Sequence, residues 1–259
     1  MIACTIPPMP TWDADQYLLY NDQRTRPCRE LAARISVPAP RTAIDLGCGP
    51  GNSTAVLAER WPQAELTGLD SSPEMIAAAK KSHPKINWQI ADIAAWANEN
   101  GPAYDLIFSN AALQWVDNHP ATFARLLHRV TPGGALAVQM PGNFDSPAHQ
   151  IMRDLAQSPH FRPHLPLPDY YDILAPAAAA VDLWETEYLH VMPDAASIVE
   201  WYKGTGLRPF LDALAGEELK ADFLAEYKRE IARAYQKRGD GKVVFPFRRL
   251  FMIAYQRSA

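Results

Sequence analysis

The sequence has few cysteines, no long hydrophobic run and no excess of basic residues. Its three cysteines are odd in number and scattered, which excludes a disulfide framework and a cysteine-based metal site. A net charge of −4 argues against a nucleic-acid-binding surface, which normally has a basic bias. No apolar run approaches the roughly 18 residues of a membrane helix, and the N-terminus lacks the basic-then-apolar order of a signal peptide. We therefore expect a cytoplasmic protein, monomeric by default, without a metal, nucleic-acid or membrane partner.

The length of 259 residues, 48% of them hydrophobic, suits one α/β domain with additions. We expect a single domain over residues 1–259, with an N-terminal helical cap over 1–36 and a helical substrate lid within about 145–240. Several of the 23 prolines cluster at 159–168, which marks a loop-rich insertion.

The first half of the chain alternates short apolar strands with helices. A helix is predicted over 26–36, opening at Pro27, a favoured position in a first turn. Further helices follow the glycine turn after residue 51, begin at Pro73 and cover 119–130. Strands are predicted at 42–46, 65–69, 86–90, 105–109 and 135–140. This alternation predicts a doubly wound, mostly parallel sheet.

After residue 145 the rhythm changes. The pattern predicts a helix over 145–157, a proline-rich loop over 158–170 and a strand over 183–191. Residues 194–237 are helical in pattern, because apolar side chains recur every four residues from Leu219 to Ile231. Residues 249–256 form a last strand. A helical insertion before a returning strand predicts a lid over the carboxyl edge of the sheet.

The most informative segment is the glycine turn after the first strand. Gly47, Gly49 and Gly51 alternate between this strand and a helix that opens on a capping Asn52 or Ser53. Such a turn lets a ligand approach the backbone, and the helix start offers unpaired N–H groups. The third glycine comes one residue earlier than in the dinucleotide fingerprint, which disfavours an NAD-dependent oxidoreductase.

Four polar residues fall at or near the carboxyl ends of predicted strands, where parallel sheets bind ligands. They are Asp45, Asp70, Asp92 and Asn110. Asp70 is placed to accept both hydroxyls of a ribose. The alternative interpretations are local: Asp70 or Asp92 as a helix cap, Asp45 as a brace for the turn, Asn110 as a strand end. Cys48 is interpreted as a small filler, because no His or cation adjoins it.

Asp45-x-Gly-x-Gly-x-Gly followed by Asp70 resembles the cofactor pocket of the class I AdoMet-dependent methyltransferases. Within that class the chain is similar to the trans-aconitate 2-methyltransferases over nearly its full length. The motifs are Tyr17-x-x-Tyr20, Arg24-x-Arg26-Pro27, Gly68-x-Asp70-Ser71-Ser72-Pro73, Ala91-Asp92-Ile93, Asn110-Ala111-x-Leu113-Gln114-Trp115, Tyr170-Tyr171-Asp172, Thr205-Gly206-Leu207-Arg208-Pro209 and Phe247-x-x-Leu250-Phe251. The stretches 158–168 and 236–245 depart from the family, so no substrate contact is carried over there.

The resemblance implies a class I, Rossmann-like fold, AdoMet as the cofactor and methylation of one carboxylate of trans-aconitate. The cofactor residues it implies are Asp45, Gly47, Gly49, Asn52, Asp70, Ser71, Met75, Asp92, Ile93 and Asn110. The substrate residues are Tyr17, Tyr20, Arg26, Gln114, Trp115, Tyr171, Arg208 and Arg248, with Arg249 and Tyr202 as further candidates.

A carboxylate has a pKa near 4 and is already a nucleophile at neutral pH, so no catalytic base is expected. His119 is accordingly interpreted as a helix-start residue. Arg is the best planar partner for the remaining carboxylates. Two alternatives remain: a methyltransferase for another small acid or a carrier-bound malonyl group, and a non-catalytic AdoMet-binding protein.

Overall fold

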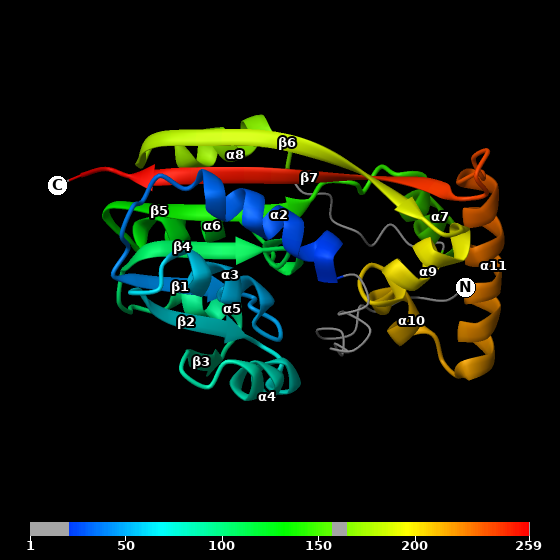
Figure 1. Cartoon of the computed structure of the whole chain (residues 1–259), viewed down its shortest axis with the longest axis horizontal. Helices are drawn as coiled ribbons and strands as arrows, with labels where there is room; N and C mark the ends of the chain where they lie inside the picture. The colour runs from blue at the N-terminus through cyan, green and yellow to red at the C-terminus, as the bar shows by residue number, and fades with distance from the viewer. Residues whose placement is uncertain (1–20, 157–164, 259) are drawn as a thin grey trace. The chain divides into compact units, whose positions relative to one another are not determined.

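Seven strands among the described residues form one mixed sheet in the order β3-β2-β1-β4-β5-β7-β6 (Figure 1). The structure is a computed structural model and describes residues 21–156 and 165–258. The strands are β1 (Thr42–Leu46), β2 (Glu65–Asp70), β3 (Asn87–Ile90), β4 (Tyr104–Asn110), β5 (Val130–Pro141), β6 (Ala178–Met192) and β7 (Val243–Gln256). Strands β1 to β5 pair in parallel, and β7 is antiparallel to β5. The predicted α/β fold with a returning last strand is confirmed.

The described residues divide into two units. The sheet unit comprises residues 22–141, 165–186 and 249–258, and the helical unit comprises 142–156 and 187–248. Helices of the sheet unit are α2 (Asn21–Arg34), α3 (Asn52–Arg60), α4 (Pro73–Ser82), α5 (Ile93–Asn98), α6 (His119–His128) and α8 (Leu167–Leu174), with a 3₁₀ turn, η1, at Leu113–Trp115. Helices of the helical unit are α7 (Pro147–Ala156), α9 (Ala195–Lys203), α10 (Arg208–Ala213) and α11 (Glu217–Ala234).

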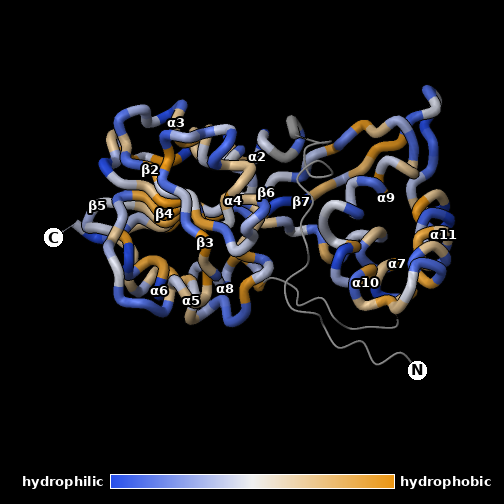
Figure 2. Tube along the Cα trace, turned by 90° about the horizontal axis from the view of Figure 1, so that it is seen from below, coloured by the Kyte–Doolittle hydropathy of each residue, from blue (hydrophilic) through white to orange (hydrophobic). Residues whose placement is uncertain are grey.

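Each unit has its own core. In the sheet unit, apolar residues of β1, β4 and β5 are buried together with Phe123 and Leu126 of α6. The middle of β4 is apolar (Figure 2), and its residues Leu106, Ile107 and Phe108 are fully buried, as expected where both faces of a parallel sheet are covered. In the helical unit, α11 packs against α7 and α9, with Tyr227 and Ile231 fully buried and Leu219 exposed. The predicted apolar stripe of α11 therefore contacts the core from Phe223 onward, and Leu219 in the first turn lies outside it.

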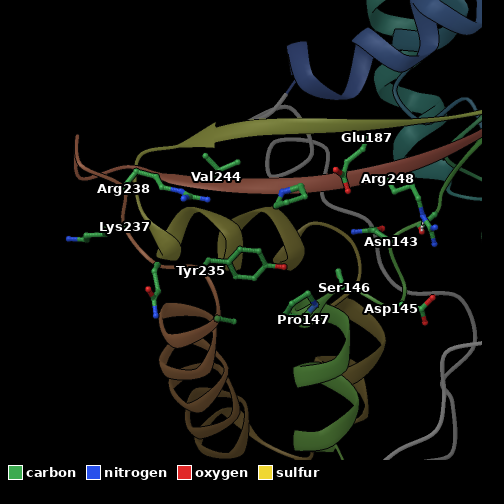
Figure 3. A pocket seen from close by; sticks show the side chains of 14 residues that line it. Asn143, Asp145, Ser146, Pro147, Glu187, Tyr235, Lys237, Arg238, Val244 and Arg248 are labelled. Atoms are coloured by element: carbon green, nitrogen blue, oxygen red, sulfur yellow. Dashed lines mark hydrogen bonds between the residues drawn. The ribbon is translucent and has the colours of Figure 1, made fainter.

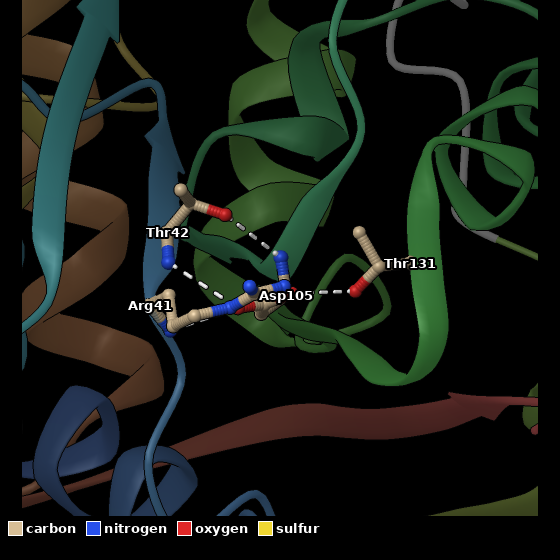
Figure 4. A network of polar contacts seen from close by, with 4 residues as sticks. All are labelled: Arg41, Thr42, Asp105 and Thr131. Atoms are coloured by element: carbon tan, nitrogen blue, oxygen red, sulfur yellow. Dashed lines mark hydrogen bonds and ion pairs between the residues drawn. The ribbon is translucent and has the colours of Figure 1, made fainter.

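The amino end of β4 is pinned to its neighbours by Asp105 (Figure 4). The carboxylate accepts hydrogen bonds from the Arg41 backbone N–H at 2.8 Å and from the Thr131 hydroxyl at 2.7 Å. Burial opposes ionisation, but these hydrogen bonds outweigh it and lower the pKa of Asp105. This network fixes β1, β4 and β5 at the edge opposite their carboxyl ends.

Several predicted boundaries were wrong. Pro27 lies inside α2 rather than opening it: the helix extends back to Asn21, while its buried residues Cys28, Leu31 and Ala32 all follow the proline. Helix α8 begins at Leu167, inside the predicted loop, and the six-residue α5 was not predicted. Both β6 and β7 start earlier than predicted, at residues 178 and 243.

No described helix is both long enough and apolar enough to cross a lipid bilayer. Within the described ranges, no group of three or more His, Cys, Asp or Glu side chains is arranged to hold a metal ion.

Candidate functional site

The glycine turn after β1 holds three residues in left-handed backbone conformations, with φ of 72° at Gly47, 54° at Gly49 and 96° at Gly51. A Cβ on Gly47 would lie 2.1 Å from the Cβ of Ala112, and one on Gly51 would lie 2.9 Å from the Trp88 ring. A Cβ on Gly49 would meet nothing within 4 Å. Gly47 and Gly51 are therefore required by packing, whereas Gly49 borders open space in which a ligand can approach the backbone.

Asp45 is fully buried at the carboxyl end of β1. Its Oδ2 accepts hydrogen bonds of 2.6 Å from the hydroxyls of both Ser53 and Thr54 on α3, while its Oδ1 has no partner among the described residues. Burial raises the pKa of Asp45 to about 6, against the lowering effect of the two hydroxyls. The carboxylate braces the helix start and still presents one unused acceptor.

The predicted cap of α3 was wrong. Its N-cap is Gly51, which makes no side-chain capping bond, and Asn52 is the first helical residue. Ser53 is the second helical residue, past the cap position, and its hydroxyl donates to Asp45. The first N–H groups of α3 are left without a side-chain cap, as at a helix start that receives a ligand.

Asp70 joins the end of β2 to the glycine turn. Its Oδ2 accepts a hydrogen bond from the Gly49 N–H at 2.9 Å, and its Oδ1 accepts one from the Ser72 N–H at 2.9 Å. The N-cap of α4 is Ser72, whose hydroxyl oxygen accepts from Met75 N–H, so the capping interpretation of Asp70 was wrong. Burial raises the pKa of Asp70, and its backbone hydrogen bonds oppose that rise.

The remaining predicted cofactor residues lie at the ends of β2, β3 and β4. Ser71 is half-buried after β2, and Met75 is buried on α4. Asp92 caps α5 by accepting from Ala95 N–H at 2.8 Å, which confirms its interpretation as a cap, and Ile93 beside it is buried near Gly47. Asn110 is buried at the end of β4, and its Oδ1 has no partner among the described residues.

The loop after β4 is strained and tightly held. Ala111 and Asn118, neither of them glycine, have φ of 57° and 52°. The Gln114 amide donates to the Ala111 carbonyl at 2.6 Å. His119, the first residue of α6 as predicted, has Nε2 2.9 Å from the Leu113 carbonyl and Nδ1 2.5 Å from the Tyr170 hydroxyl. A carbonyl only accepts, so Nε2 carries the proton and the ring anchors the loop that bears Gln114 and Trp115.

Comparison with known proteins adds the family. Residues 43–134 match the model of the methyltransferase domain family. Trans-aconitate 2-methyltransferase of Azoarcus sp. (strain BH72) is 50% identical over 256 residues, covering 95% of this chain and 99% of that protein. The enzyme of the same name from Acidovorax ebreus (strain TPSY) is 49% identical over 257 residues, covering 95% and 98%. The chain belongs to the trans-aconitate 2-methyltransferase family.

Solved structures agree on the fold. The YcgJ protein of Bacillus subtilis has a TM-score of 0.61 at 12% identity and covers 90% of this chain and 100% of its own. Phosphoethanolamine N-methyltransferase 2 of Haemonchus contortus, solved with S-adenosyl-L-methionine, has a TM-score of 0.55 at 15% identity, covering 90% of this chain and 53% of its own. The chain is an AdoMet-dependent methyltransferase.

The residues predicted to bind substrate are distributed over both units. Tyr17 and Tyr20 lie outside the described residues. In the sheet unit, Gln114 and Trp115 are half-buried after β4, Tyr171 is exposed on α8, and the Arg26 side chain is 66% exposed and paired with Glu30 at 2.8 Å. Arg208 and Arg248 belong to the helical unit, and the first of these opens α10.

The helical unit contains a cavity of about 700 Å³ (Figure 3). Arg248 lines it and donates from Nε to the Gly142 carbonyl at 2.7 Å. Tyr235 lies between Lys237 and Arg238 on one side and Asn143 and Arg248 on the other (Figure 3). Tyr202 is buried in the core of this unit, where its hydroxyl accepts from the Asn143 amide at 2.8 Å. The Tyr202 hydroxyl therefore has a structural role, whereas Arg248 borders the cavity.

Burial also decides the interpretation of Cys48. Burial raises the pKa of its thiol, and the nearby carboxylates of Asp45 and Asp70 raise it further. A thiol held in its neutral form is a poor nucleophile, which supports the prediction of a filler. Its Sγ would lie 3.1 Å from a Cβ on Gly68, so it fills the space between the turn and β2.

Sequence analysis missed one polar residue of this edge, Gln139. Its side chain is fully buried on β5, and its Oε1 accepts a hydrogen bond from Arg249 on β7 at 3.3 Å. The available signal was a single amide within the otherwise apolar strand Ala135–Met140. A buried polar side chain needs a partner, and that partner is supplied by a strand more than 100 residues away.

The raised pKa of Asp45 predicts a pH-dependent stability. Because the folded-state pKa lies above the ordinary value of 3.8, the folded protein binds more protons than the unfolded chain between about pH 4 and 6. The free energy of unfolding should therefore fall as pH rises through this window, by up to about 3 kcal/mol from this group. We expect Asp45→Asn to remove that slope and to raise the melting temperature at pH 8.

Denaturant unfolding of wild type and Asp45→Asn at pH 4, 6 and 8 measures the effect. Asp70, whose pKa burial also raises, contributes a slope of the same sign to both proteins, so the difference between them reports Asp45 together with its charge coupling to Asp70. Parallel curves for the two proteins would show that Asp45 does not titrate in this range.

Proposed function

We propose that this protein transfers a methyl group from AdoMet to one carboxylate of trans-aconitate, giving a monomethyl ester. The observation that carries the proposal is the identity of about 50% over nearly the whole chain to relatives of that name. The proposed form is a cytoplasmic monomer acting on a small acid. We also propose that the insertion at about 145–240 serves as the substrate lid and residues 1–36 as the cap.

The glycine turn fits AdoMet. The buried Oδ1 atoms of Asp45 and Asn110 are unused acceptors for the ligand's ammonium group, and Gly49 leaves its backbone open to a close approach. A carboxylate oxygen offers more than one lone pair, so Asp70 can accept ribose hydroxyls as well as its two backbone N–H groups. Asn52, Ser71, Met75, Asp92 and Ile93 complete the proposed cofactor site.

Bound AdoMet supplies a methyl group that is electrophilic because it is attached to a sulfonium. The acceptor is a carboxylate with an ordinary pKa near 4, so it is ionised at neutral pH and the protein need not remove a proton. What the side chains contribute is orientation: one carboxylate oxygen must be held in line with the methyl group. The proposed residues for this task are Gln114, Trp115, Tyr171 and the arginines, together with Tyr17 and Tyr20.

The test is a methyl-transfer assay with radiolabelled AdoMet over a panel of small di- and tricarboxylates. We expect trans-aconitate to be the best acceptor and to yield a product that loses its label on mild alkaline hydrolysis, as an ester does. A better acceptor elsewhere in the panel would move the assignment to another small acid, and no transfer to any acid would contradict it.

The absence of a proton transfer makes a further prediction. We expect kcat for trans-aconitate to be flat from about pH 6 to 9, because a preformed carboxylate needs no catalytic base. Initial rates at saturating concentrations of both substrates measure this. A bell-shaped profile, or a limb that disappears in a His119→Asn variant, would show that a protein group takes part in proton transfer.

A further inference from the structure

Three polar side chains share one face of the sheet at its carboxyl edge. Gln139 on β5 lies opposite Asn110 on β4, and Phe251 on β7 lies opposite Gln139 from the other side. Residues two apart on a strand share a face, so Arg249 projects from the same face as Gln139. Because β7 runs antiparallel to β5 and Arg249 pairs with Pro141, Arg249 lies at the edge at which β4 and β5 end.

This cluster brings a cation into the protein interior. Arg249 is 3% exposed and Gln139 is fully buried. Arg249 Nη1 donates to Gln139 Oε1 at 3.3 Å, so the interaction that joins them is between a guanidinium and a neutral amide. An apolar side chain of similar volume would fill this position without the penalty of removing a charge from water. The arginine is therefore kept at a cost in desolvation.

The arginine also determines which group of the Gln139 amide is left for a ligand. A guanidinium has only donors, so the contact requires the amide oxygen to face Arg249 and turns the NH₂ group away. That Nε2 atom is buried and has no acceptor within the described part of the chain. A buried donor without an acceptor costs stability unless a ligand supplies one. The cluster thus combines a buried positive charge with an N–H donor that needs an anionic or neutral oxygen.

We propose that Arg249 and Gln139 form the subsite for a carboxylate of the acceptor that is not methylated. The inference rests on the proposed function and specifies how the acceptor is recognised. The reacting carboxylate loses its charge as the ester forms, so a cation beside it would stabilise the substrate more than the transition state. A spectator carboxylate keeps its charge throughout and is the group that a buried arginine can hold without slowing the reaction.

Two variants test the subsite. Arg249→Met removes the charge and keeps a similar side-chain volume. Gln139→Glu introduces a carboxylate that pairs with the Arg249 guanidinium in place of the carboxylate of the ligand. Arg257→Met is the matched control, because Arg257 is an exposed residue just after β7 whose guanidinium donates to the carbonyls of Pro176 and Ala178. Calorimetry measures the affinity of the AdoHcy-loaded protein for trans-aconitate, the affinity of the free protein for AdoHcy, and the melting temperature.

We expect both variants to bind trans-aconitate about 10- to 100-fold more weakly, the range for lost hydrogen bonds to a charged group, with AdoHcy affinity within about twofold of wild type. The melting temperature of Arg249→Met should change little, because removing the buried charge offsets the hydrogen bond that Gln139 Oε1 loses. For dicarboxylates that lack the carboxylate bound by Arg249, the affinity of both variants should equal that of wild type. The affinity of Arg257→Met should equal that of wild type for every ligand.

Unchanged affinity of Arg249→Met or Gln139→Glu for trans-aconitate would overturn the subsite. A parallel loss of AdoHcy binding and of melting temperature would overturn it too, since that pattern belongs to a structural residue. These results leave wild-type methylation of trans-aconitate intact and so concern the subsite alone. Wild-type protein that neither binds nor methylates trans-aconitate would instead remove the proposed function, and the subsite with it.

Discussion

Replacing Gly49 with Val should abolish cofactor binding while leaving the fold in place. The Cβ of the new side chain meets nothing within 4 Å, so the protein itself has room for it, and the space it fills is the space proposed for AdoMet. Overpacking with a branched side chain costs up to about 3 kcal/mol and occasionally more, which at that upper end weakens binding by about 100-fold or more. Calorimetric titration with AdoHcy measures the loss, and circular dichroism checks the fold.

Backbone strain must be separated from occupied space, because Gly49 has a φ of 54°. Gly241→Val is the control: its φ is 82°, a Cβ there also meets nothing within 4 Å, and it belongs to the helical unit. Both variants should lose a similar amount of stability, about 1–2 kcal/mol from the left-handed conformation, and only Gly49→Val should lose AdoHcy. Normal affinity in Gly49→Val would remove the glycine turn from the cofactor site.

The strands of the sheet unit were predictable because their signals are local. Thr42–Leu46 is a short segment with apolar residues at 43, 44 and 46, bounded by an arginine and a glycine turn, and the structure gives the same limits. Pro27 misled because proline is only favoured in a first turn, and here α2 begins at Asn21 and carries the proline in its interior. Helix α5 is six residues long, too short to show a helical period.

The difference between local signals and tertiary packing also applies to the candidate site. Asp45 and Asp70 were predictable, because each stands at a strand end next to the glycine turn. The partners of Asp45 were not predictable. From the sequence alone Ser53 is an equally good helix cap, and only the structure shows that its hydroxyl donates to Asp45. The pairing of Gln139 with Arg249 depends on the register of β5 with β7, which joins residues more than 100 positions apart and leaves no local pattern.

The second large effect is expected at Asp70. Asp70→Ala should weaken AdoHcy binding by about 2–4 kcal/mol, or roughly 30- to 1000-fold, because charged hydrogen bonds to the ribose are lost and its hydroxyls are left unpaired. Part of this loss comes from disorder of the glycine turn, since the carboxylate also accepts a hydrogen bond from the Gly49 N–H at 2.9 Å. Calorimetry with AdoHcy and with its 2′-deoxy and 3′-deoxy analogues separates the two contributions.

If Asp70 contacts the ribose, removing a hydroxyl from the ligand should cost wild type affinity and cost Asp70→Ala almost nothing further. If Asp70 acts only by ordering the turn, each deoxy analogue should lose the same factor with both proteins. Ser72→Ala is the matched control, because it removes the N-cap of α4, worth about 1 kcal/mol, without touching the carboxylate. We expect that variant to melt at a lower temperature and to bind AdoHcy as wild type does. An unchanged AdoHcy affinity in Asp70→Ala would refute the ribose assignment, whatever its effect on the turn.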